Sequence, residues 1–74
     1  MDIKKAIELL MSKYPGQIPN GYWVKSDVIV INTRPIKALR GMTSPSQFAI
    51  TEKGEVYGVT PIMYDLSIED MKTL

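Results

Sequence analysis

The chain has 74 residues, 45% of them hydrophobic, and contains neither cysteine nor histidine. This length suits a single small domain, and the missing side chains remove disulfides, the thiol nucleophile and the usual zinc ligands. The net charge of +1 gives no global attraction to nucleic acid or acidic membranes, and no apolar run approaches the ~20 residues that span a bilayer, so we expect a soluble, cytoplasmic protein.

The first predicted element is an amphipathic helix that begins after Asp2 and ends near Lys13. Asp2 can cap the free amides at its start, whereas Pro15 disfavours helical geometry at Tyr14. The apolar residues at helical spacing form one stripe: Ile3, Ala6, Ile7, Leu10, Met11 and Tyr14. The stripe predicts that one face of this helix packs on the rest of the fold.

Two strands are predicted next. Residues 15–21 hold two prolines and two glycines and are expected to form a connector, so the strand pattern begins at Tyr22. Residues 28–31 are apolar at every position, which is typical of a central strand covered on both faces. The polar residues 25–27 are either a turn between two paired strands or an interruption of one long strand. We favour the turn.

Residues 33–46 have the least regular pattern. Pro35 and Gly41 bracket residues 36–40, an order that suits one or two helical turns. Residues 41–46 are expected to form a loop.

A β-hairpin is predicted between Gln47 and Pro61. A three-residue loop with Gly54 in the left-handed conformation is favoured, because a two-residue loop would set Glu52 directly across from Glu55. The favoured register gives these opposed pairs: Thr51 with Glu55, Ile50 with Val56, and Phe48 with Gly58.

The last segment has the pattern of a helix start. Ser67 is the expected cap, Asp70 can reach back to it, and Leu66 and Met71 stand at hydrophobic-staple positions. A helix this short must dock on the sheet through Ile68, Met71 and Leu74. The expected fold is therefore α+β, a two-layer sandwich over residues 1–74 in the order helix–strand–strand–irregular segment–strand–strand–helix, with an antiparallel sheet.

Catalytic and metal-binding patterns are weak. Asp65, Glu69 and Asp70 lack the regular spacing of a calcium loop, and Glu52 and Glu55 lie at an exposed turn. We expect no enzymatic activity, no catalytic residue, no metal and no cofactor. Only a pocket enclosing a carboxyl group among Glu55, Asp65 and Glu69 would favour an enzyme.

Tyr22 and Trp23 are the candidate partner-binding residues. Adjacent strand positions point to opposite faces, so only one of the two is expected to enter the core, and the other is available to a protein partner. An alternative site for nucleic acid is the basic set Arg34, Lys37 and Arg40, which recurs every third residue. No aromatic residue accompanies it for stacking, so nucleic acid is the less favoured partner.

Residues 45–61, PSQFAITEKGEVYGVTP, follow a leading helix and give an apolar strand, an acidic glycine-bearing turn and a second strand. This order resembles the small YrhB-type immunity proteins, which neutralise toxins of bacterial competition systems. The resemblance implies a protein partner, and no functional residue is transferred from it. The sequence thus predicts a non-enzymatic protein-binding module, in an immunity or phage-accessory role in a bacterium, with another protein or a second copy of itself as partner and no membrane contact.

Overall fold

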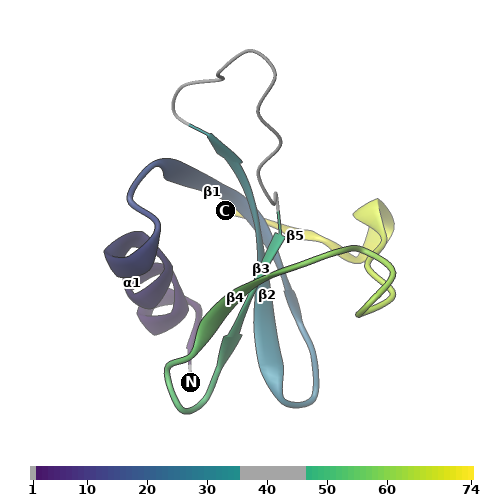
Figure 1. Ribbon diagram of the computed structural model, residues 1–74. Coiled ribbons are helices and arrows are strands. Elements are labelled where there is room, and N and C mark those ends of the chain that lie inside the picture. Colours follow the sequence, from purple (N-terminus) through teal and green to yellow (C-terminus); the bar gives the residue numbers. More distant parts are fainter. Residues whose placement is uncertain (1, 36–46) are drawn as a thin grey trace.

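The computed structural model describes residues 2–35 and 47–74. In this part of the chain one helix, α1 (Ile3–Lys13), precedes five strands: β1 (Gln17–Val24), β2 (Val28–Pro35), β3 (Gln47–Thr51), β4 (Val56–Val59) and β5 (Lys72–Thr73). A short 3-10 helix, η1 (Ile68–Asp70), lies just before β5. The strands form one antiparallel sheet in the order β4-β3-β2-β1-β5 (Figure 1), which confirms the α+β class.

Helix α1 has the predicted bounds and the predicted cap. The Asp2 carboxylate accepts a hydrogen bond from the Lys5 backbone N–H at 2.8 Å, which satisfies one of the free amides of the first turn. Ala6 and Leu10 are fully buried, and Ile3, Ile7 and Tyr14 pack around them. Met11, also on the predicted stripe, is half-buried.

Both predicted hairpins form. The first turns at Ser26 and Asp27, where the Lys25 N–H donates to the Val28 carbonyl at 2.9 Å. In the second, Gly54 has φ 88°, so it adopts the left-handed conformation that favours glycine. The predicted register is confirmed: Ile50 pairs with Val56, Phe48 pairs with Gly58, and the Thr51 N–H donates to the Glu55 carbonyl.

The predicted connector is wrong over most of its length, because β1 already begins at Gln17. Its register against β2 shifts between Pro19 and Gly21, so Asn20 is the extra residue of a bulge. A bulge tolerates proline and glycine within a strand, since the regular ladder is interrupted there. The prolines and glycines of residues 15–21 therefore indicate an irregular strand, and not the absence of a strand.

The irregular segment was predicted to begin at Thr33, but β2 continues through Arg34 to Pro35. Thr33 and Arg34 pair with β1, and the Thr33 hydroxyl donates to the Gln17 side chain at 2.9 Å. The predicted helical turn over residues 36–40 and the loop over 41–46 lie outside the described residues.

The predicted C-terminal helix is wrong. After Ser67 the chain makes only the three residues of η1, and then pairs with β1 as the two-residue strand β5. Ser67 does not cap a backbone amide; its hydroxyl donates to the Asp70 carboxylate at 2.9 Å. A helix of so few residues has few internal hydrogen bonds to offset its nucleation cost, whereas the free edge of β1 offers partners directly.

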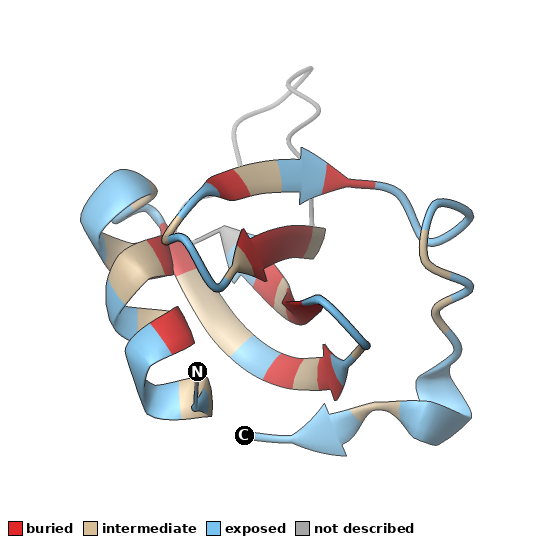
Figure 2. Ribbon diagram, turned by 90° about the horizontal axis from the view of Figure 1, so that it is seen from below, coloured by how far each residue is buried: buried red, intermediate tan, exposed pale blue. Residues whose placement is uncertain are grey.

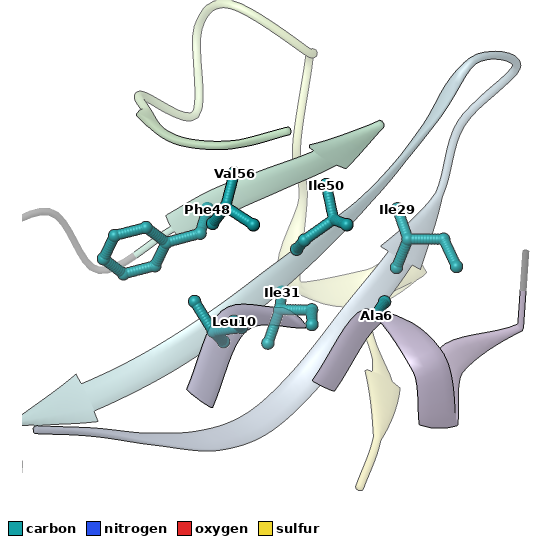
Figure 3. Close-up of a cluster of buried hydrophobic side chains, with 7 residues drawn as sticks. All are labelled: Ala6, Leu10, Ile29, Ile31, Phe48, Ile50 and Val56. Atoms are coloured by element: carbon teal, nitrogen blue, oxygen red, sulfur yellow. The ribbon is translucent and has the colours of Figure 1, made fainter. Parts of the chain in front are cut away.

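The two faces of the sheet are covered differently (Figure 2). Helix α1 covers one face, and residues 60–71, which we call the strap, lie over the other. Figure 3 shows the helix-side cluster, in which the helical residues face the strand residues. Its buried members are Ala6, Leu10, Ile29, Ile31, Phe48, Ile50 and Val56.

The strap-side cluster is smaller. Its buried members are Trp23, Val28, Val30, Ala49 and Val59. The alternation of Val28–Ile31 between the two clusters confirms that β2 is central and buried on both faces.

Candidate binding surface

The two predicted partner-binding residues lie on opposite faces of β1. Trp23 belongs to the strap-side cluster and is 5% exposed, whereas Tyr22 is half-buried against the helix-side cluster. One aromatic residue of the pair thus enters the core, and Tyr22 retains some accessible surface. The Lys72 ammonium group lies 6.0 Å from the centre of its ring, within reach of a cation–π contact.

Trp23 also connects β1 to the strap. Its indole N–H donates to the Ser67 backbone carbonyl at 2.8 Å, and Leu66 and Met71 pack against the cluster that contains its ring. A buried indole N–H normally finds an acceptor, and here the strap supplies it. Trp23 therefore links the strap to β1 by a hydrogen bond and by apolar packing.

A second contact fixes the start of the strap. The hydroxyl groups of Tyr57 on β4 and Tyr64 on the strap lie 2.9 Å apart and share a hydrogen bond. Two backbone bonds tighten the turn between them, from Met63 N–H to the Thr60 carbonyl and from Leu66 N–H to the Pro61 carbonyl. The strap thus contains no α-helix and is tied to the sheet through Tyr64 and Ser67.

The outer side of the strap is apolar at several positions. Ile62 is 92% exposed, Ile68 84% and Met63 60%, and these are three of the five large exposed hydrophobic residues in the described part of the chain. The sequence-based prediction placed Ile68 in the core and gave Ile62 and Met63 no role. A sequence signal existed, since the pair Ile62-Met63 follows Pro61 and belongs to no helical or strand period.

Of the predicted basic set, Arg34 is exposed near the end of β2. Lys37 and Arg40 lie outside the described residues.

A hollow of about 470 Å³ lies between the two hairpin turns. Its lining includes Lys25 and Lys53, the carboxylates of Asp27 and Glu55, and Tyr57. The hydrogen bond to Tyr64 raises the pKa of Tyr57, with smaller contributions from burial and the nearby negative charge. The carboxylates of Asp27 and Glu55 in this lining belong to exposed residues. No group of three acidic, histidine or cysteine side chains positioned to hold a metal ion occurs within residues 2–35 and 47–74.

The edges of the sheet are short. Strand β4 has four residues, and its Val56 carbonyl accepts a hydrogen bond from the Lys13 ammonium group at 2.9 Å. On the opposite side β5 has two residues. Short strands and a lysine at an edge are features that discourage pairing with another chain. The exposed apolar side of the strap is therefore the better candidate surface.

No family model matches this chain, and no curated protein or solved structure is significantly similar to it. In the described part of the chain, no helix has both the length and the apolar character needed to cross a membrane.

Proposed function

We propose that this protein is a non-enzymatic protein-binding module that contacts its partner through the outer side of the strap. The exposure of Ile62, Met63 and Ile68 is the observation that supports this proposal. Side chains so exposed contribute little to folding, and apolar residues concentrated on one segment are typical of an interaction surface. Tyr22, the half-buried member of the predicted aromatic pair, lies on the opposite face of the sheet and is not part of this surface.

An immunity or phage-accessory role suits this activity, because such a protein acts by occupying its partner and needs no chemistry of its own. The strap suits binding better than the sheet edges do, since the strand edges are short and Lys13 occupies one acceptor of β4. The proposal places the protein in the cytoplasm of a bacterium, with another protein as its partner.

The test compares two variants in a crosslinked pull-down from the native host. Ile62→Ser with Met63→Ser should reduce recovery of the partner by about tenfold, because truncating central apolar contacts commonly costs this much. Val24→Ser is the matched control, since Val24 is as exposed as Met63, at 60%, but lies on β1 away from the strap. Failure of the native protein to retrieve any partner, or equal loss in the control, would contradict the proposal.

A further inference from the structure

A groove lies between the strap and the sheet. Its volume is about 300 Å³, and its apolar lining comes from Trp23, Pro61, Leu66, Ile68 and Met71. This volume is at the lower end of the range of roughly 300–1,000 Å³ for small-molecule sites. The groove therefore suits a single side chain better than a large cofactor.

The polar part of the lining consists of neutral amides. The Gln47 side chain donates to Asn32 at 2.9 Å, and the Asn32 side chain donates in turn to Asn20 at 2.7 Å. Each side-chain amide has two donor hydrogens and an acceptor oxygen, so Gln47 keeps capacity for a further bond. An apolar slot beside such amides suits a side chain together with the peptide group that carries it. None of the described residues that line this groove is charged, so its occupant is expected to be neutral.

Three acidic residues of the strap are close in sequence to groove residues. Asp65, Glu69 and Asp70 are exposed and flank the groove residues Leu66 and Ile68 in sequence. The one ion pair within the described residues joins Lys5 to Glu8 on the helix, so these three carboxylates form no ion pair within the described part of the chain. Their charge favours positively charged groups on a partner segment that approaches this part of the strap.

From these observations we infer that the groove binds one aliphatic or aromatic side chain of a partner protein, presented on a segment that also carries lysine or arginine. The inference rests on the proposed protein-binding function and specifies the chemistry of the partner. Ile68 contributes to both the groove and the exposed side of the strap, so a single partner segment can contact the two together.

The test uses three short synthetic peptides, each titrated into the intact protein. In the first, glycines separate a central leucine from two flanking arginines; the second has glutamates in place of the arginines, and the third has glycine in place of the leucine. Trp23 is the only tryptophan of the chain, so its fluorescence and its indole N–H resonance report on the groove directly.

We expect the first peptide to shift the Trp23 indole signal and the Met71 methyl signal in a saturable manner. The glutamate peptide should bind about fivefold more weakly, as expected for a few exposed charge contacts, and the peptide without leucine should give no saturable shift. The variant Ile68→Ser should lose binding while remaining folded, since Ile68 is 84% exposed, and Val24→Ser should bind normally.

Shifts confined to residues away from Trp23 and Met71, equal binding of the glutamate peptide, or the absence of any shift would overturn the inference. The proposed protein-binding function and the groove assignment can be contradicted independently of each other. If the pull-down depends on Ile62 and Met63 while no peptide shifts Trp23, protein binding stands and the groove assignment falls. If the arginine peptide binds but no partner depends on the strap, the groove stands and the proposed function falls.

Discussion

The two faces of the central sheet differ in what covers them. On one face, α1 places Ala6 and Leu10 against strand residues, and both are fully buried. On the other face, the strap contributes Leu66 and Met71, which are only half-buried, and leaves Ile62 and Ile68 exposed. No large apolar residue of the helical stripe is exposed, whereas the strap divides its apolar residues between the sheet and the solvent. We infer that the helix side supplies most of the stability and the strap side supplies the contact surface.

The largest effect is expected from Phe48→Ala on the helix side. Phe48 is 1% exposed, and its ring centre lies 4.7 Å from that of Tyr14. Removing a buried phenyl ring costs about 3–5 kcal/mol of unfolding free energy, which is comparable with all that a core below ~80 residues supplies. Chemical denaturation followed by circular dichroism should show a largely unfolded protein.

The matched control for this change is Ile68→Ala on the strap, which should alter the unfolding free energy by less than about 0.5 kcal/mol because the side chain is exposed. A folded Phe48→Ala protein that is as stable as the native chain would refute the assignment of stability to the helix side.

An intermediate and local effect is expected from Gly21→Ala. A methyl group at Gly21 would lie 2.5 Å from the Met71 sulfur, so the Met71 side chain at the end of the strap must move. Overpacking of this kind costs about 1–3 kcal/mol. Hydrogen exchange should accelerate at the Leu74 N–H, which donates to the Asn20 carbonyl, while the amides of β2 and β3 keep their protection.

Two further variants sharpen the Gly21 experiment. Gly16→Ala is the control, because nothing lies within 4 Å of the added methyl group there. The double variant Gly21→Ala with Met71→Ala removes the clash and should recover part of the lost protection. Equal acceleration across the whole sheet would mean that the strap and the helix side unfold as one unit.

A smaller effect, about 1 kcal/mol, is expected from Asp2→Ala, which removes the cap of α1. Asp2→Asn keeps an acceptor oxygen and should retain most of the stability. Ser67→Ala is the corresponding change on the strap, where the hydroxyl caps no backbone amide, and it should cost less. Thermal unfolding of the three variants would test this order. A larger loss of stability from Ser67→Ala than from Asp2→Ala would contradict the inference that the helix side supplies most of the stability.

The smallest effect is expected from Tyr57→Phe, which removes the hydrogen bond to Tyr64 at the start of the strap and should cost below about 1 kcal/mol at neutral pH. The pKa of Tyr57 is raised in the folded protein, so above pH ~10 the unfolded chain loses this proton first. The stabilising contribution is therefore complete below pH ~10 and is lost as the pH rises further. Denaturation curves of the native chain and the variant should differ below that pH and converge above it.

The hairpin and the helix could be predicted from the sequence because each is encoded by neighbours along the chain. Gly54 sets the turn and the register that follows from it, and the spacing of Ala6 and Leu10 defines the helical stripe. At the aromatic pair, alternation along β1 also predicted that one residue would be buried. It did not predict which one, because that depends on the strap that lies over Trp23.

The prediction of a C-terminal helix was wrong because the conformation of this segment, too, depends on contacts with residues distant in the chain. Ser67 and Asp70 resemble a helix start, but the segment is too short for local hydrogen bonds to outweigh the pairing available at β1. Ile62 and Ile68, on which the candidate surface depends, are exposed in the folded chain.

The sequence alone determined the α+β class, the bounds of α1, the two turns and the central, doubly buried position of β2, because periodicity, capping and turn residues act over a few positions. Only the tertiary structure decided that β1 extends back to Gln17 through a bulge, that residues 60–71 form a strap, and that β5 completes the sheet. These features depend on hydrogen bonds and contacts between residues distant in the chain, and no local pattern specifies them.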